Sequence, residues 1–320
     1  MSNVDAKIYC FGDCNVDMPI LIDSIPVKGG CCFSDKADMG IGGSMLNTCV
    51  ALSKMQLNSV PVTKLGNDIF GDMIYSYLTE EGMPVFAVTR ADEYQTGLLV
   101  GLVESDGEKR WVSVRLNASD IHIFYDELDK LETPECLFIT GVELNEGKES
   151  RQAAIKYAEK IHSLGGKVYL DPSLRVPDRK IPKDVFDTFV AIMPFVDVFL
   201  ANEEELIMIG QSEDVEKACK NVKAMGAGHL WTKLGGDGCC YYDGHDFQYF
   251  SPEKIKAIDT SGAGDSFNAA IIYSELNGFD IAHAGKFANM FAAYVVERIG
   301  TIRALPSYEE TMEMVRRSAL

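Results

Sequence analysis

The chain has 320 residues, of which 48 are acidic and 30 are basic, so its formal charge at pH 7 is −18. Hydrophobic residues make up 47% of the sequence, which is ample for a large core and excludes a disordered or collagen-like chain. A surface this acidic repels nucleic-acid phosphates and anionic membranes, so we expect neither a nucleic-acid partner nor a membrane partner. A small phosphorylated ligand remains compatible, because a local cradle of backbone N–H groups binds an anion even on an acidic protein.

The cysteine pattern and the N-terminal residues predict a soluble, cytoplasmic protein. The nine cysteines contain no Cys-x-x-Cys spacing, so neither a disulfide framework nor a structural zinc site is expected. The first residues lack the apolar run of a signal peptide, and no stretch of about 18 consecutive apolar residues occurs anywhere. We therefore expect free thiols that are buried or partly buried in a reducing compartment.

Short apolar runs alternate with amphipathic stretches, which predicts a mostly parallel sheet with helices on both faces. Strands are expected at residues 8–11, 60–65, 136–140, 167–171, 196–200 and 229–233. Helices are expected at residues 44–55, 150–164, 215–225, 264–276 and 281–298, with a last helix from Ser307. Because no Pro/Gly-rich linker interrupts this pattern, residues 1–320 are expected to form a single α/β domain.

Two stretches break the alternation and predict a small additional layer. Residues 15–22 are extended and directly follow the first strand. Residues 96–104 and 110–116 flank Asp106-Gly107, a dipeptide typical of two-residue hairpin turns. An antiparallel ribbon beside a parallel sheet is either a lid over a site or an ordinary edge hairpin. The lid would comprise about residues 14–40 and 92–118.

The second arm of this hairpin has two different faces. Val112, Val114 and Leu116 point to one side, whereas Trp111 and Arg115 point to the other. The apolar side is compatible with a homodimer formed lid to lid, and equally with packing on the chain's own core. The sequence leaves these two alternatives open.

The segment most informative about chemistry is Asp-Thr-Ser-Gly-Ala-Gly-Asp-Ser-Phe at residues 259–267, which opens a predicted helix. The small residues Gly262, Ala263 and Gly264 let the backbone approach a ligand and aim successive N–H groups at one point. Asp265 follows directly, although a carboxylate here could also serve only to complement the helix dipole. A base beside an anion hole is what phosphoryl transfer to an alcohol needs, because one accepts the hydroxyl proton while the other holds developing charge.

Three other nucleotide-binding patterns do not occur in the chain. The P-loop sequence Gly-x-x-x-x-Gly-Lys-Ser/Thr is absent. The dinucleotide fingerprint Gly-x-Gly-x-x-Gly fails twice at its third glycine, where the chain has Met45 and Phe267. The His-Arg-Asp triplet of protein kinases is also missing. These observations argue against a P-loop protein, a Rossmann dehydrogenase and a protein kinase.

Five motifs in order resemble those of the ribokinase-like, or PfkB, carbohydrate kinases. They are Gly-Gly followed by Asn at 42–47, Asp-Pro-Ser-Leu-Arg at 171–175, Asn-x-x-Glu at 202–205, a Gly-x-x-Gly nucleotide loop at 233–238 and the C-terminal signature at 259–267. The second resembles the Asp-Pro-Asn-x-Arg segment of the fructokinase and ketodeoxygluconate kinase branches. The resemblance spans the whole chain and implies a ribokinase-like fold: a three-layer, Rossmann-like, mostly parallel sheet with helices on both faces and a small antiparallel β lid.

The resemblance also implies ATP and Mg²⁺ as cofactors and gives roles to individual residues. Asp265 would be the general base, with the amides of residues 262–264 as the anion hole. The residues implied for the nucleotide are Asn202, Glu205, Lys233, Gly235, Gly238 and Asn289. Glu205 with Asn202 would hold Mg²⁺ through water; a helix cap and an exposed acid are the alternative for this pair. Asp259 and Ser261 resemble a loop for a monovalent cation such as K⁺, completed by carbonyls near residues 295–300.

The acceptor substrate is less well defined by the sequence. The residues implied for sugar hydroxyls are Asn15, Asp17, Gly42, Gly43 and Asn47, with Glu143 as a further contact. Ribokinases commonly carry Lys where this chain has Ser44, so ribose is not specifically supported. Arg115 and Arg175 would together bind a substrate carboxylate or phosphate. Alternatively, Arg115 lies on the lid without contacting the substrate, and Arg175 pairs with a structural acid. Asp17, too, could be only an edge-strand charge.

These observations lead to one expected activity and two alternatives. We expect ATP-dependent phosphorylation of a hydroxymethyl group on a small sugar or sugar acid that is fructose-, ribose- or 2-keto-3-deoxygluconate-like. A nucleoside kinase of the same fold is the first alternative, because Trp111 and Met18 could stack on a base. A non-catalytic protein that senses sugars or nucleotides is the second, since fold alone does not establish activity.

Overall fold

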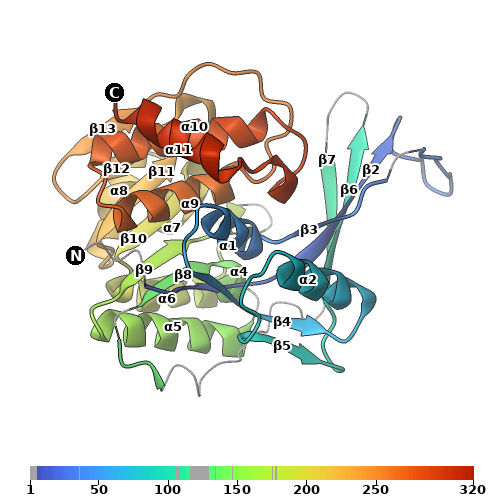
Figure 1. Cartoon of the computed structure of the whole chain (residues 1–320), viewed down its shortest axis with the longest axis horizontal. Coiled ribbons are helices and arrows are strands. Elements are labelled where there is room, and N and C mark those ends of the chain that lie inside the picture. Colours follow the sequence, from blue (N-terminus) through green and yellow to red (C-terminus); the bar gives the residue numbers. More distant parts are fainter. Residues whose placement is uncertain are drawn as a thin grey trace.

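The computed structural model describes residues 6–35, 37–104, 109–115, 130–133, 135–145, 147–174, 176 and 179–320. Figure 1 shows a large sheet between two layers of helices, with a small sheet projecting from one side. The predicted turn at Asp106-Gly107, Leu116 and Arg175 lie outside the described residues. No helix in the described ranges is long and apolar enough to cross a membrane. All nine cysteines are free thiols, and only Cys31 and Cys32 are exposed.

The large sheet carries the carboxyl-terminal edge on which the candidate site is built. Within the described residues its order is β13 (Phe247–Phe250), β12 (Cys239–Tyr242), β11 (His229–Lys233), β10 (Val198–Asn202), β9 (Lys167–Asp171), β8 (Cys136–Thr140), β1 (Ile8–Phe11), β4 (Ser59–Gly66) and β5 (Val88–Ala91). Neighbours pair in parallel from β11 to β5, whereas β12 is antiparallel to both β11 and β13. Parallel strands end at one common edge, which is where α/β proteins bind ligands.

Helices cover both faces of this sheet, so the predicted three-layer fold is confirmed. One core cluster joins the sheet to α1 (Ser44–Lys54), α2 (Ile69–Glu80), α9 (Ala263–Leu276), α10 (Ile281–Val296) and α11 (Tyr308–Ser318). The other joins it to α5 (Lys148–Ser163), α6 (Lys183–Ile192), α7 (Glu203–Gly210) and α8 (Val215–Ala224). In β1, Ile8 and Cys10 enter the first cluster while Tyr9 and Phe11 enter the second, which explains the continuous apolar run of this strand.

One strand is displaced from its predicted position. The sequence predicts a strand at 196–200, but β10 spans Val198–Asn202. Residues Met193–Phe195 form a 3₁₀ turn, and Val196 N–H donates a hydrogen bond to Met193 O at 3.0 Å. The strand therefore starts later and runs directly into α7, so that Asn202 stands at the beginning of that helix.

The small sheet has the order β3 (Gly40–Gly42), β2 (Asn15–Ile22), β6 (Gly97–Glu104) and β7 (Lys109–Val114). The predicted hairpin arms pair antiparallel as β6 and β7, and β3 is antiparallel to β2. β2 and β6 pair in parallel, so the layer is a mixed sheet rather than a purely antiparallel one.

Residues 111–114 of β7 are exposed on both faces of the strand. Val112 and Val114 are 56% and 43% exposed, so neither is packed on the core of its own chain. On the other face, Trp111 lies against Gly101, where an added Cβ would come within 2.5 Å of the indole ring. Arg303 also joins the small sheet to the main body, with Nη1 lying 2.8 Å from Asp38 Oδ2.

Candidate active site

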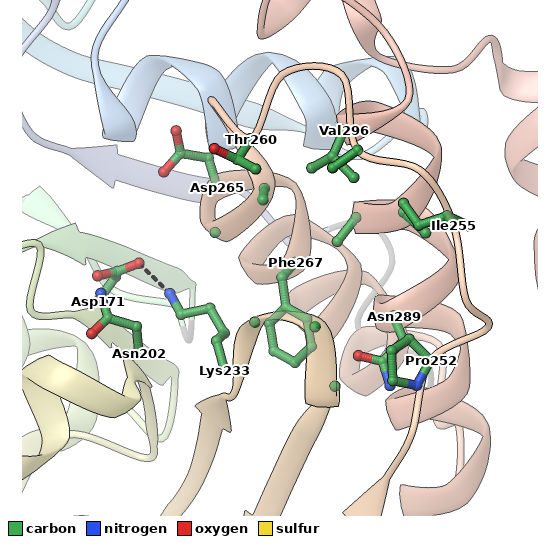
Figure 2. A pocket seen from close by; sticks show the side chains of 18 of the residues that line it. Asp171, Asn202, Lys233, Pro252, Ile255, Thr260, Asp265, Phe267, Asn289 and Val296 are labelled. Carbon is green, nitrogen blue, oxygen red and sulfur yellow. Dashed lines mark hydrogen bonds and ion pairs between the residues drawn. The ribbon is translucent and has the colours of Figure 1, made fainter. Parts of the chain in front are cut away.

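A cavity of about 640 Å³ lies at the carboxyl-terminal edge of the large sheet, against α9 and α10. Figure 2 shows Asp171, Asn202 and Lys233 together on one side of it, with Pro252 and Asn289 on the other. Asp265 lies at the start of α9 and also lines this cavity. The predicted base, nucleotide loop and Asn-x-x-Glu motif, which are far apart in sequence, therefore border one space.

The glycine before α9 is required by the backbone. Gly262 has φ 76°, a left-handed conformation, and an added Cβ would lie 2.9 Å from Cγ2 of Thr301. Ala263 and Gly264 then form the first turn together with Asp265. Amides of a first helical turn have no acceptor inside their own helix, and they point along the positive end of the helix dipole. This segment can therefore hold an anion beside the Asp265 carboxylate.

Two side chains of α1 hold the Asp265 carboxylate. Ser44 Oγ donates to Oδ1 at 2.5 Å, and Asn47 Nδ2 donates to Oδ2 at 2.7 Å. Thr48 Oγ1 donates to the main-chain oxygen of Asp265 at 3.2 Å, which fixes the two helices against each other. Burial raises the pKa of Asp265, and the hydrogen bonds from Ser44 and Asn47 only partly oppose this rise. A carboxylate with a raised pKa is a better proton acceptor than an exposed one.

The residues predicted to bind sugar hydroxyls gather beside Asp265. Gly42 has no room for a side chain, because a Cβ would lie 2.2 Å from Asp17 Oδ2; Gly43, at φ 108°, would place one 2.7 Å from Asp13 O. These glycines bring the start of α1 onto β2. Asn15 Nδ2 donates to Asp17 Oδ1 at 2.5 Å. The structure thus brings these residues and Asn47 into one cluster with the predicted base.

Burial raises the pKa of Asp17 to about 6, against the lowering effect of its hydrogen bond from Asn15. The negative charges of Asp265 and Asp13 raise this pKa further, whereas Arg115 lowers it. Asp17 is therefore within the electrostatic field of the predicted base, which an isolated edge-strand charge would not be.

A buried ion pair forms the floor of the cavity. Lys233 Nζ lies 2.8 Å from Asp171 Oδ2 and 3.1 Å from Asn268 Oδ1. Burial acts to raise the pKa of Asp171, but the Lys233 ammonium, together with hydrogen bonds from Asn268 and Ser173, holds that pKa below its ordinary value. Ser173 Oγ lies 3.1 Å from Asp171 Oδ1 and 3.3 Å from Ser44 Oγ. A polar chain therefore runs from Lys233 to the Asp265 carboxylate.

Asn202 and Glu205 form a reciprocal cap at the start of α7. Asn202 Oδ1 accepts from Glu205 N–H at 2.9 Å, and Glu205 Oε2 accepts from Asn202 N–H at 3.0 Å. Glu205 Oε1 also accepts from Leu174 N–H at 3.1 Å, and the residue is only 6% exposed. The helix-cap alternative is thus correct for Asn202, but Glu205 is a buried acid, and both residues line the cavity.

The nucleotide loop after β11 is shaped by glycine. An added Cβ at Gly235 would meet no atom within 4 Å, so this residue faces open space in the cavity. Gly238 has φ 96°, and its Cβ would lie 2.0 Å from Phe250 O. Asn289 Nδ2 donates to the same oxygen at 2.7 Å. Side chains of Pro252, Ile255 and Val296 complete an apolar end of the cavity, shown on the right of Figure 2.

The segments predicted to form a monovalent-cation loop lie side by side. Asp259 Oδ1 accepts from Ser261 N–H at 3.0 Å, and Oδ2 accepts from Gly300 N–H at 3.1 Å. Ile258 N–H donates to Val296 O at 2.7 Å. A second cavity, of about 440 Å³, extends from this loop to the small sheet and α2.

Two predicted substrate contacts have different surroundings from those expected. Glu143, on α4 (Val142–Asn145), is fully buried and is not among the described residues that line either cavity. Arg115 was predicted to face a substrate carboxylate, but its Nη1 lies 2.6 Å from Oδ2 of buried Asp13. The second arginine of that predicted clamp, Arg175, lies outside the described residues.

Sequence reasoning missed three polar residues of this region: Asp13, Ser173 and Asn268. Asp13 and Ser173 each come two residues after a parallel strand, β1 and β9, and so lie at the binding edge of the sheet. Asn268 stands three residues after Asp265 on α9, on the same face of the helix. These positional signals could have identified all three.

Comparisons with known proteins agree with this geometry. The family model described as pfkB family carbohydrate kinase matches residues 5–307. Fructokinase-1 of Zea mays is 25% identical over 93% of this chain and 96% of its own, and 5-dehydro-2-deoxygluconokinase of Shouchella clausii is 27% identical over 86% of both. A ribokinase structure from Arabidopsis thaliana, complexed with ribose and ATP, covers 97% of this chain and 99% of that chain with a TM-score of 0.81 at 22% identity. The chain therefore has the ribokinase-like fold and belongs to the PfkB family of carbohydrate kinases.

Proposed function

We propose that this carbohydrate kinase transfers the γ-phosphoryl group of ATP to a hydroxymethyl group of a small sugar or sugar acid, with Asp265 as the general base. The observation that carries the proposal is the position of Asp265. Its carboxylate adjoins the amides of residues 262–264 and is hydrogen-bonded to Ser44 and Asn47 on α1. The candidate base, in the first turn of the helix that would supply the anion hole, is thus hydrogen-bonded to a candidate sugar ligand, Asn47.

The proposed reaction has one proton transfer and one phosphoryl transfer. Asp265 accepts the proton of the acceptor hydroxyl, and the oxygen forms a bond to the γ-phosphorus as the bond from that phosphorus to the β–γ bridging oxygen breaks. ADP leaves with the electron pair of the broken bond. The amides of Gly262, Ala263 and Gly264 would hold the charge on the transferred group, and the Ala263 N–H would exchange its 3.3 Å hydrogen bond to Thr260 O for one to that group.

The shape of the larger cavity supports ATP as the donor. Its apolar end, with Pro252, Ile255 and Val296, suits a flat base such as adenine, and Asn289 borders it. Gly235 presents backbone without a side chain between this end and Asp265, where phosphates would lie. Lys233 borders the same region, but its positive charge is balanced by Asp171. The Lys233–Asp171 pair would therefore add no net positive charge to the phosphate site.

The donor chemistry near Asn202 fits Mg²⁺ held through water. Glu205 is a buried acid that lines the cavity, and carboxylate oxygens suit hydrogen bonds from Mg²⁺-bound water. Mg²⁺ supplies charge neutralisation on the transferring phosphates when bound. Asp259 and Ser261 would likewise hold a monovalent cation, with carbonyls of residues 295–300 as further ligands; Asp259 is bonded to Gly300 of that segment.

A second candidate activity, nucleoside phosphorylation, is favoured by one observation. The second cavity places Trp111 and Tyr77 near Asp17, with Met73 and Ile41 beside them. Aromatic and thioether side chains could pack on a base that is attached to a ribose. A protein that senses sugars or nucleotides without turnover remains the third candidate.

The lid carries a further proposal, a homodimer formed through the small sheet. Val112 and Val114 stand exposed on its outer face, beside Val100 and Leu98 in the register of β6 and β7. Pairing of two such faces would remove this apolar surface from water. Analytical ultracentrifugation of wild type and Val112→Lys tests it, because a monomeric wild type would contradict the proposal.

The activity is tested by measuring ADP release with ATP and Mg²⁺ across a panel of acceptors. The panel contains ribose, fructose, 2-keto-3-deoxygluconate, tagatose phosphate and nucleosides. Turnover of a sugar or sugar acid supports the proposed function, and turnover of nucleosides alone supports the second candidate. Binding of sugar or ATP without any ADP release would indicate the sensing protein.

A further inference from the structure

A buried acid of the chain already neutralises Arg115, which lies beside Asp17 in the predicted sugar-binding cluster. This acceptor cluster consists of Asn15, Asp17, Gly42, Gly43 and Asn47. Arg115 directly follows β7, and its Nη1 lies 2.6 Å from Asp13 Oδ2. Arg115 Nε also donates to Ser113 Oγ at 2.9 Å. Asp13 comes directly after Gly12 at the end of β1 and is 2% exposed. Recruiting Arg115 to an anionic ligand would leave the Asp13 carboxylate buried without its cation, which is strongly unfavourable.

The neighbour of this pair on β2 is an acid, Asp17. Asp17 lies near enough to Asp265 and Asp13 for both charges to raise its pKa, and near enough to Arg115 for that charge to lower it. Asp13 Oδ1 has no hydrogen-bond partner among the described residues although it is buried. Asn47 Oδ1 is likewise buried and has no hydrogen-bond partner among the described residues. These two buried oxygens lack hydrogen-bond donors among the described residues, and hydroxyl groups of a substrate would supply them.

The second cavity reaches Asp17 from the side of the small sheet, and its charged lining is likewise mainly acidic. Its lining includes the acids Asp17, Asp38, Glu80 and Asp259, whereas Arg303 is its one basic residue among those described. Arg303 is itself paired with Asp38 at 2.8 Å. An anionic group that extended from the acceptor site into this cavity would therefore meet like charge, and the part of the lining that the structure describes offers no unpaired basic side chain.

We infer that the acceptor pocket selects an uncharged, hydroxyl-rich substrate and rejects sugar acids and sugar phosphates. The inference rests on the proposed function and narrows it. It also replaces the expected carboxylate clamp at Arg115: this arginine anchors the end of the lid to Asp13 instead of binding the substrate's charge. Selection then comes from unpaired acceptors that favour hydroxyl donors and from carboxylates that repel anions.

The first test compares matched neutral and acidic ligands with the wild-type protein. Fructose is paired with 2-keto-3-deoxygluconate, and an aldohexose with the corresponding hexonic acid. Both kcat/KM and Kd are measured, the latter by calorimetry in the presence of a non-hydrolysable ATP analogue. We expect the acid of each pair to be weaker by about 10²-fold or more, since like charges in a desolvated site oppose binding. An acid that binds as well as its neutral partner overturns the inference.

The second test removes the negative charge that is paired with Arg115. Asp13→Asn keeps the shape of the side chain but leaves the guanidinium uncompensated, so the neutral-to-acid ratio should fall by about tenfold or more. Glu104→Gln is the matched control, because Glu104 pairs with Arg110 on the same lid, away from the acceptor cluster. Its ratio should equal that of the wild type. An unchanged ratio in folded Asp13→Asn protein contradicts the proposed role of the pair.

A third variant keeps the question answerable if Asp13→Asn does not fold. In the double variant Asp13→Asn/Arg115→Gln the ion pair is removed without a change in net charge. Neutral and acidic ligands should then lose affinity to the same extent, because the guanidinium serves the lid and not a substrate charge. A loss confined to the acid would restore the carboxylate clamp and overturn the inference. Selective binding of neutral sugars without ADP release would reject the proposed kinase activity but support the preference for uncharged ligands. Preferred turnover of sugar acids would support the kinase activity but reject that preference.

Discussion

Asn47 Nδ2 donates a hydrogen bond to Asp265 Oδ2 at 2.7 Å, joining the helix after Gly42-Gly43 to the helix after the anion-hole segment. The two residues are 218 positions apart in sequence. The contact ties a predicted sugar ligand to the predicted base, so an acceptor hydroxyl held by Asn47 would lie next to the carboxylate. This relationship underlies the first two predictions.

Replacement of the predicted base should remove turnover and spare nucleotide binding. Asp265→Asn keeps the size of the side chain but lacks a proton acceptor, so kcat should fall by about 10²- to 10⁴-fold. The Kd for ATP should stay within about twofold, because only the cavity end nearest α1 is altered. Asp280→Asn, a change at the N-cap of α10 outside the cavity, is the control. Equal kcat in Asp265→Asn and wild type would disprove the assignment.

The acid limb of the pH profile should report the environment of Asp265. The ionised carboxylate is the active form, and burial raises its pKa, so kcat/KM should decline at a pH above the ordinary range of aspartate. Asn47→Leu removes one donor that favours the ionised form and should move this limb upward by about one pH unit. Thr48→Val is the matched control, because Thr48 donates to the main-chain oxygen and not to the carboxylate. A limb that stays in place in Asn47→Leu would count against the proposed base.

Asp17 should destabilise the fold at neutral pH. Its pKa is raised to about 6 from 3.8, so its ionised form is less favourable in the folded than in the unfolded chain. Asp17→Asn should therefore raise Tm at pH 7.5 by about 2–5 °C. The gain should shrink as the pH falls through 6, where the wild-type carboxyl becomes protonated. Asp38→Asn, an exposed lid acid paired with Arg303, should give no such gain. A gain for Asp17→Asn that is independent of pH would contradict this explanation.

The glycine before α9 should matter for activity as well as for stability. Gly262→Ala forces a Cβ to within 2.9 Å of Thr301 Cγ2 at a left-handed φ of 76°, and so displaces the anion-hole amides. Gly278→Ala, at φ 69° with no atom within 4 Å, carries the same backbone cost of about 1–2 kcal/mol without the clash. Both variants should melt earlier, but only Gly262→Ala should lose kcat by about tenfold or more. Equal activities of the two variants would argue against the amide anion hole.

Local patterns were sufficient for much of the fold. β8, β9 and β11 have the predicted bounds, because short apolar runs between turns define buried parallel strands. The parallel pairing of β2 with β6 was not predictable, because it joins segments that are far apart in sequence and depends on the tertiary arrangement of the small sheet. The same holds for Arg115: its position on the lid could be read from alternation along the strand, whereas its pairing with Asp13 depends on tertiary contact.

The candidate site was predicted best where a residue's role lies in the backbone. Gly43, Gly238 and Gly262 all have positive φ, as required for close approach between segments. Side-chain roles were harder to predict, because one residue can have two roles at once. Asn202, for example, is both a helix cap and a cavity-lining residue. Glu143, expected at the sugar, is fully buried and is not among the described residues that line either cavity.

The most direct test of the central claim is detection of the phosphorylated product. Wild-type protein and Asp265→Asn are incubated with Mg²⁺, the acceptor panel and ATP labelled with ³²P at the γ position, and the products are identified by chromatography and mass spectrometry. Our account predicts a sugar that carries the labelled phosphate on its hydroxymethyl oxygen with wild-type protein, and about 10²-fold less or lower with Asp265→Asn. Label that appears only as inorganic phosphate, or equal product from both proteins, would contradict it.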